Sequence, residues 1–152
     1  MIKLSRVLIA ASAAALLATG CASGPEFKDV ASSIPTIKES QGRIYFYRSN
    51  SLIGAALQPD INLNDQAVGK SKPGGFFYVD EPAGDYVVST TTETKKTLSF
   101  KLEAGETKYV KTSVGLGLLV GRIIPSLESS EVANKDLEGL HYIGTPTTAA
   151  SK

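Results

Sequence analysis

The residue with the most definite chemistry in this chain is Cys21, the single cysteine among 152 residues. Two basic residues near the start precede an apolar run over residues 7–18, and small residues up to Gly20 lead directly into the cysteine. Positive charge, a short apolar run and a small-residue cleavage site form the order expected of a secretory signal. We therefore predict that residues 1–20 are a signal peptide and that the chain is cut between Gly20 and Cys21.

A thiol at the first mature position has a second meaning, because Ala18-Thr19-Gly20-Cys21 resembles the lipobox of bacterial lipoproteins. In that class the sulfur carries a diacylglyceryl group and the new amino terminus is acylated. The resemblance implies that Cys21 is the lipidation site and that membrane lipid is a partner. Ala22 and Ser23 follow, which resembles the pattern of lipoproteins sorted to the outer membrane. We expect a cell-envelope protein, lipid-anchored in the outer membrane and facing the periplasm.

Two other interpretations of this segment stay open. An uncleaved anchor needs about 20 apolar residues to cross a bilayer, whereas the run here is shorter and is followed by Gly20, Gly24 and Pro25. Ordinary signal cleavage, which Ala18 and Gly20 also permit, leaves a free thiol in an oxidising compartment, and such an odd cysteine asks for an explanation. A cleaved lipoprotein signal accounts for the short run, and acylation of Cys21 accounts for the lone thiol.

The other residues with catalytic or metal-binding chemistry form no recognisable motif. His141 is the single histidine, so a site with several histidine ligands is not possible. Five acidic residues lie near expected turns, where aspartate is common in any case: Asp60, Asp65, Asp80, Glu81 and Asp85. We predict no catalytic residue, no metal site, no cofactor and no enzymatic activity. The alternative is a carboxylate-dependent envelope enzyme acting on glycans, which would need two carboxyls about 5–10 Å apart in a cleft.

One strand is a candidate binding surface. Arg43, Tyr45 and Tyr47 alternate along one face of the segment 42–48, and arginine with aromatic residues often anchors a partner. We predict a possible binding patch there for an unidentified envelope protein or glycan. In a sandwich one face of every strand is buried, so the tyrosine face could be core instead, and this alternative stays open.

The composition of the mature chain limits its size and its partners. Without residues 1–20 it has 132 residues, enough for one domain with its own core. The formal charge falls from +1 to −1 because the removed segment carries two basic residues. A near-neutral chain without a basic block gives no electrostatic basis for binding nucleic acid.

Three parts follow the signal. Residues 21–41 mix serine, proline, glycine and charges, which predicts a flexible tether that reaches about 25 Å over roughly 20 residues. Residues 42–144 carry the alternating patterns of a β domain. The small, polar residues 145–152 predict a disordered tail.

Short alternating segments separated by turn residues dominate the domain. Their spacing of 8–12 residues predicts a mainly β fold, an antiparallel β-sandwich of about 7–8 short strands with one short C-terminal helix. Asn64-Asp65 predicts a two-residue hairpin. Alternation predicts an inward set: Ile44, Phe46, Leu63, Val88, Leu98, Phe100 and Val110.

Two further segments are less regular. Ser129 or Ser130 can cap a helix that places Ala133, Leu137 and Leu140 on one face. The apolar stretch 116–124 predicts a core strand, and contact with the membrane or a partner stays open as the alternative. The polar residues 93–96 predict a surface hairpin turn.

The segments GRIYFYRSNS at 42–51 and INLNDQAVGKSKPGGFFYVDEPAGDYVVS at 61–89 resemble the bacterial family called domain of unknown function 2846. The resemblance covers about residues 42–125 and departs where Gln66 and Tyr86 replace the glycine and histidine that are frequent there. It implies a fold and supplies no activity. We expect a lipid-anchored envelope lipoprotein whose non-catalytic β-sandwich domain binds an envelope partner.

Overall fold

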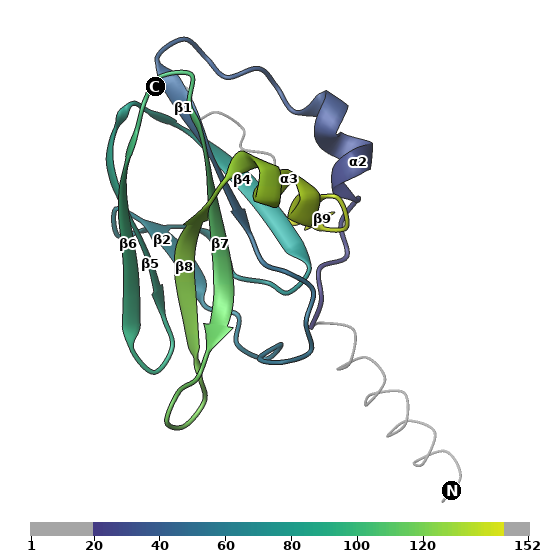
Figure 1. Cartoon of the computed structure of the whole chain (residues 1–152), viewed down its shortest axis with the longest axis vertical. Coiled ribbons are helices and arrows are strands. Elements are labelled where there is room, and N and C mark those ends of the chain that lie inside the picture. The colour runs from purple at the N-terminus through teal and green to yellow at the C-terminus, as the bar shows by residue number, and fades with distance from the viewer. Residues whose placement is uncertain (1–19, 145–152) are drawn as a thin grey trace, which may run out of the picture.

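Two β-sheets face each other in the computed structural model, which describes residues 20–144 (Figure 1). The first sheet has the order β8 (Arg122–Glu128), β7 (Thr107–Gly115), β1 (Gln41–Tyr47), β4 (Gly75–Pro82), β9 (His141–Tyr142). The second has the order β3 (Gln66–Lys70), β2 (Asp60–Leu63), β5 (Gly84–Thr91), β6 (Lys95–Leu102). The prediction of a mainly β sandwich is confirmed. Residues 1–19 of the predicted signal peptide and the predicted tail 145–152 lie outside the described residues.

The second sheet is antiparallel throughout, as predicted, whereas the first is mixed. β1 pairs antiparallel with β4 but parallel with β7, and β4 pairs parallel with β9. A parallel pair needs a crossover connection, and the chain between β1 and β7 supplies it with β4 and all four strands of the second sheet. Asn64 and Asp65 both have positive φ angles, 47° and 65°, as the predicted two-residue hairpin between β2 and β3 requires.

The main core lies between the two sheets. Ile44 and Phe46 of β1 point into it and are fully buried, and the ring of Phe46 stacks on Phe77 with centroids 5.1 Å apart. The rest of the predicted inward set lines the same core, with Leu63, Val88 and Val110 buried and Leu98 and Phe100 partly buried. The predicted alternation therefore gives the correct inward face.

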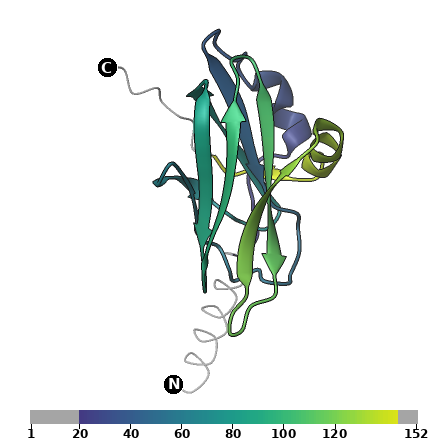
Figure 2. The ribbon, with the colours of Figure 1, turned by 60° about the vertical axis from the view of Figure 1, so that its left-hand side comes forward.

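A second core lies on the outer face of the first sheet, where helices cover it (Figure 2). Helix α3 (Ser130–Leu137) is capped by Ser129, whose hydroxyl accepts from the Val132 N–H, as predicted. Ala133, Leu137 and Leu140 are buried against the outward side chains of β1 and β4. In the described residues no helix is long and apolar enough to span a membrane.

The segment before β1 is not a flexible tether over its length, so this prediction is corrected. It forms α2 (Phe27–Val30) and η2 (Ala31–Ser33), which lie against the second core. Phe27 donates its N–H to the Leu140 carbonyl at 2.9 Å and packs edge-on against Phe76, with centroids 5.3 Å apart. Phe27, Val30 and Ile34 pack against the second core. They are scattered among polar residues without a helical or strand period, so the sequence alone does not predict this packing.

The stretch 116–124 is also corrected. β7 and β8 pair as far as Gly115 and Arg122, so the residues between them form a connecting loop instead of a buried strand. Gly121 has a φ of 99°, a conformation that glycine adopts readily and that lets the chain turn back into β8. Only the later part of the stretch enters a strand, where Ile123 is buried.

Candidate functional site

The predicted binding patch is part of the core. Arg43, Tyr45 and Tyr47 are at most 8% exposed, because α2, α3 and neighbouring strands cover that face of β1. Tyr45 stacks on Tyr109 with centroids 5.4 Å apart. Burial raises the pKa of Tyr47, and the nearby charge of Asp136 raises it further. These three residues do not form a surface for a partner, so this prediction is wrong.

Arg43 instead holds the segment before β1 against the sheet. Its guanidinium donates to both carboxylate oxygens of Asp80, from Nε at 2.6 Å and from Nη2 at 2.7 Å, and Nη2 also donates to the Pro35 carbonyl at 2.8 Å. Its hydrogen bonding to the Asp80 carboxylate raises the pKa of Arg43. The same guanidinium lies 4.5 Å from the ring centre of Tyr78. By bonding to both Asp80 on β4 and Pro35, the Arg43 guanidinium fixes residues 34–36 beside β4.

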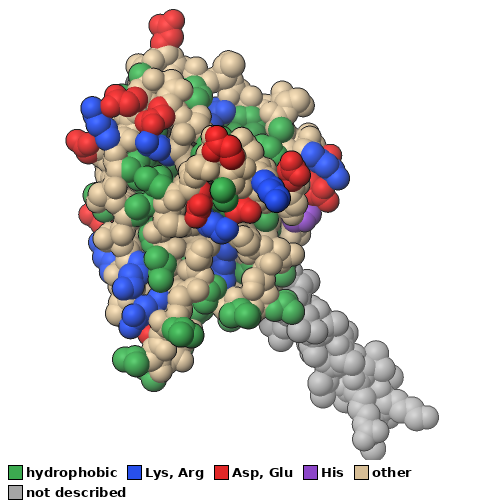
Figure 3. Space-filling view, viewed as in Figure 1, with side chains coloured by type: hydrophobic (Ala, Val, Ile, Leu, Met, Phe, Trp, Pro, Cys, Tyr) green, Lys and Arg blue, Asp and Glu red, His purple; other side chains and the backbone are tan. Residues whose placement is uncertain are grey.

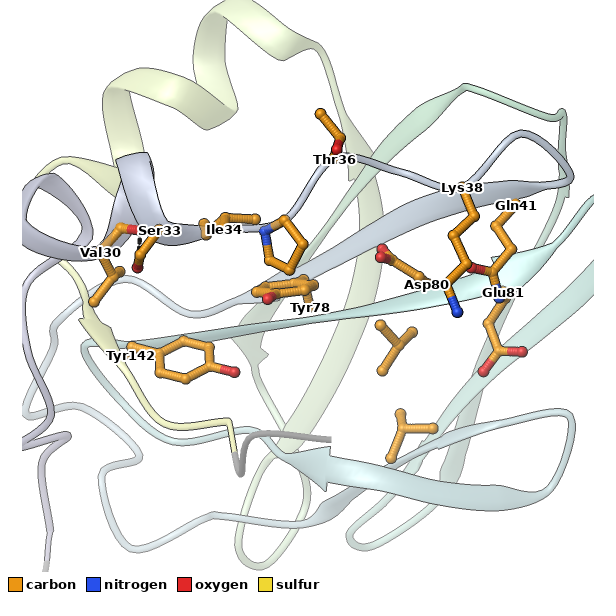
Figure 4. Close-up of a pocket in the computed structure, with 13 residues that line it drawn as sticks. Val30, Ser33, Ile34, Thr36, Lys38, Gln41, Tyr78, Asp80, Glu81 and Tyr142 are labelled. Carbon is orange, nitrogen blue, oxygen red and sulfur yellow. Dashed lines mark hydrogen bonds between the residues drawn. The ribbon is translucent and has the colours of Figure 1, made fainter. Parts of the chain in front are cut away.

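A groove of about 840 Å³ opens between that segment and β4 (Figure 4). Tyr78 and Tyr142 lie along one part of it, and Lys38 and Glu81 lie at the other end with Asp80. Burial raises the pKa of Glu81, and the charge of Asp80 adds to the effect. Aromatic faces beside charged groups suit a peptide or a glycan.

The acidic residues expected near turns do not gather in one place. Asp60 pairs with Lys70 at 2.7 Å and Asp65 with Lys95 at 3.1 Å, both on the solvent-exposed surface. Only Asp80 and Glu81 line the groove, and they occupy successive strand positions, whose side chains point to opposite faces. Within residues 20–144 no group of three or more histidine, cysteine or acidic side chains is placed to hold a metal ion.

His141 lies in β9, after α3, as a half-buried side chain. Its Nδ1 lies 2.7 Å from the Gly24 carbonyl oxygen. The backbone of the same residue bridges to Glu26, so the histidine holds the N-terminal segment against the sheet. The expected position after a helix is correct.

Cys21 is exposed, with a free thiol. The described chain starts beside it, at the lower end of the domain in Figure 1. Its neighbours are fixed on both sides. The Gly20 carbonyl accepts from Gln58 Nε2 at 2.7 Å, and the Ala22 N–H donates to the Pro73 carbonyl at 3.0 Å. The cysteine therefore stands on the surface with no free chain between it and the fold.

The same end carries the most exposed apolar side chains of the described residues. Each is between 62% and 97% exposed, whereas the next large apolar side chain, Val132, is 45% exposed. They belong to the β1–β2 and β7–β8 connections: Leu52, Ile53, Leu116, Leu118, Leu119 and Val120. We call these six residues the apolar end, and green side chains mark its β7–β8 tip at the bottom of Figure 3. The sequence signal for the larger loop is the apolar run 116–124 with its glycines, and the prediction of a core strand there is wrong for the exposed part.

Glu93 organises the larger of these two loops. Its carboxylate accepts from the backbone N–H groups of Leu118 at 2.9 Å and Gly121 at 3.3 Å, and also from those of Leu119 and Val120. These donors, Val120 first, lower the pKa of the Glu93 carboxyl to about 2. A polar turn residue that sequence analysis placed on the surface thus fixes the shape of a loop 25 residues away.

Comparisons with known proteins match most of the β-sandwich domain. Residues 38–121 match the profile of a family described as "Protein of unknown function (DUF2846)". A curated protein of Haemophilus influenzae, described only as an uncharacterized protein, is 30% identical over 132 residues, which cover 84% of this chain and 78% of that protein. No solved structure matches.

Proposed function

Because the chain belongs to the DUF2846 family of proteins of unknown function, which supplies no activity to transfer, we propose its function from its own residues. It is a lipid-anchored protein of the cell envelope. Its β-sandwich domain binds an envelope partner and catalyses no reaction.

The observation that carries the anchor is the position of Cys21. Its thiol is exposed and free at the first residue after the predicted signal, so an acylating enzyme can reach it. Two or three acyl chains hold a protein firmly at a membrane, because each buried methylene contributes about 0.8 kcal/mol. The exposed cysteine therefore suits a permanent anchor.

Metabolic labelling with an alkyne fatty acid tests the anchor. The wild-type chain should be labelled and processed, and Cys21→Ser should lose both labelling and cleavage. A matched control is the double variant Cys21→Ser with Ser23→Cys, which restores an exposed thiol two residues away and should stay unlabelled. Labelling that persists in Cys21→Ser would refute acylation at this residue.

The location in the outer membrane rests on Ala22 and Ser23, which carry none of the acidic charge that retains such proteins in the inner membrane. Ala22→Asp should move the protein to the inner-membrane fraction of a two-membrane cell on a density gradient. Ser23→Ala should leave it in the outer-membrane fraction. An unchanged location for Ala22→Asp would contradict the sorting argument.

The groove beside β4 is the proposed binding site. A photo-crosslinking residue in place of Lys38, which is exposed at the rim of the groove, should give an adduct with an envelope protein or glycan in cells. The same residue in place of Lys101, exposed on β6, should not give that adduct. Adducts of equal yield at both positions, or at neither, would remove the groove as the binding site.

The alternative, a glycan-cleaving enzyme, would use Asp80 and Glu81 in this groove. Asp80 already accepts two hydrogen bonds from Arg43, and the adjacent strand positions direct the two carboxyls apart. Asp80 therefore acts as the anchor of the groove wall, which favours binding over catalysis. Loss of a measured glycan-cleaving activity in Glu81→Gln would support the enzyme instead.

A further inference from the structure

We propose that the apolar end inserts into the lipid bilayer, so that the domain lies directly against the membrane in which Cys21 is anchored. The anchor part of this statement rests on the proposed function. The insertion of the two loops is a separate contact with lipid, carried by side chains that the anchor does not use.

The apolar end is unlike the rest of the described surface. Its six side chains are large, aliphatic and more than half exposed, and they come from two loops far apart in the sequence. A folded domain in water rarely presents a cluster of this kind unless a partner or a membrane covers it. Aliphatic side chains suit the non-directional interior of a bilayer.

The two loops lie side by side, and the start of the described chain is bound to one of them. A Cβ built on Gly121 would lie 3.3 Å from Leu57 Cδ1, so the β7–β8 loop contacts the β1–β2 connection. That connection in turn holds the start of the described chain, through the hydrogen bond from Gln58 to the Gly20 carbonyl. The two loops and the start of the described chain, which includes Cys21, therefore share the lower end of the domain (Figure 1).

The residues that follow Cys21 are bound to the domain, so a lipid anchor on Cys21 would hold the domain close to the membrane. Ala22 is already bound to the Pro73 carbonyl, and Pro25 accepts from the Tyr142 N–H at 2.8 Å. An acylated Cys21 consequently holds the domain at the headgroup level instead of some 25 Å above it, the reach estimated for a flexible tether of roughly 20 residues. The neighbouring apolar side chains then meet the bilayer.

The backbone of the β7–β8 loop suits an environment without water. Four consecutive N–H groups, those of residues 118–121, donate to the Glu93 carboxylate. Backbone groups that enter hydrocarbon must be satisfied within the protein, because lipid offers no hydrogen bonds. The loop therefore presents its aliphatic side chains outward while these polar groups stay paired.

Tryptophan fluorescence tests the insertion, since the chain contains no tryptophan. Leu119→Trp and Ile53→Trp each place one probe in the apolar end, and Val132→Trp places the control on α3, away from that end. The full chain, produced in acylated form, is reconstituted into vesicles of phosphatidylethanolamine and phosphatidylglycerol with brominated acyl chains. We expect blue-shifted, strongly quenched emission for Leu119→Trp and Ile53→Trp, and unquenched emission for Val132→Trp.

The outcomes separate this proposal from the anchor. Unquenched Leu119→Trp and Ile53→Trp in acylated, vesicle-bound protein would overturn insertion and leave the anchor in place. If mass spectrometry finds no acyl chain, the anchor proposal fails, and the single thiol of Cys21 is coupled to a maleimide lipid so that quenching still decides the insertion. Emission that is blue-shifted without vesicles, together with dimers in sedimentation, would identify a second copy as the occupant and overturn the proposal. Two probe positions keep the test valid if one variant does not fold.

Discussion

The outer face of β1 and the β7–β8 loop are both apolar and both lie outside the core between the sheets, yet only one of them is covered. Tyr45 and Tyr47 are buried under helices that come from both ends of the described chain. The loop side chains, Leu118 among them, stand in water with nothing from residues 20–144 above them. Apolar character thus identifies a surface that must be covered, but only the topology decides whether the chain covers it itself.

The largest effect on stability is expected in the main core between the two sheets. Phe46→Ala removes a fully buried ring from between the sheets and should lower the free energy of unfolding by about 3–5 kcal/mol. Chemical denaturation followed by circular dichroism measures it. A loss below about 1 kcal/mol, the size of an ordinary substitution, would mean that the outer core under the helices dominates stability.

The covered outer face of the first sheet is tested at Phe27, which packs on it from α2. Phe27→Ala removes the ring that packs on Phe76, and because Phe27 is only partly buried the loss should be about 1–2 kcal/mol, less than for full burial. Lys28→Ala, exposed on the same helix, should change the free energy of unfolding by less than about 0.5 kcal/mol. Equal and small losses of stability from the two variants would mean that this segment does not pack on the sheet and is a flexible tether after all.

The sequence predicted the sandwich well because alternation and turn chemistry are local signals. Ile44, Phe46 and the Asn64-Asp65 hairpin all lie as expected. The outer core was missed because it combines residues more than 100 positions apart, as in the hydrogen bond from Phe27 to Leu140. The apolar face of the C-terminal helix is readable from its spacing, but the segment before β1 that packs beside it shows no periodic pattern.

The candidate site shows the same limit. The exposure of Cys21 follows from its place beside the predicted signal. The apolar end depends on a contact that no pattern encodes, between the Glu93 carboxylate and backbone groups 25–28 residues later. Glycines around an apolar run were the only sequence signal for a loop there.

The shape of the exposed loop should depend on pH through Glu93. Its carboxyl has a pKa of about 2 in the folded state, below its ordinary value of 4.5, so the ionised form stabilises the loop. This contribution is fully present above about pH 4.5 and is lost as the pH falls towards 2. Backbone amide signals of residues 118–121 should shift over that range in nuclear magnetic resonance spectra.

Two variants separate this effect from general acid unfolding. Glu93→Gln should move the same amide signals at neutral pH and remove most of their pH dependence. Glu103→Gln, which changes an exposed carboxylate in another turn, should leave them unchanged. Unaltered signals in Glu93→Gln would show that the loop keeps its shape without the carboxylate.

The smallest effect on stability is expected from a leucine of the exposed loop, and a leucine of the covered face is its matched comparison. Leu137→Ala, under the helical cover, should cost about 2–5 kcal/mol because it leaves a cavity in the outer core. Leu119→Ser, in the exposed loop, should change the free energy of unfolding in water by less than about 0.5 kcal/mol, since its side chain is already solvated. The same Leu119→Ser protein on vesicles should lose part of its lipid contact although its fold is unaffected. A large loss of stability in water from Leu119→Ser would mean that another part of this chain covers the loop, and the contrast between the two regions would disappear.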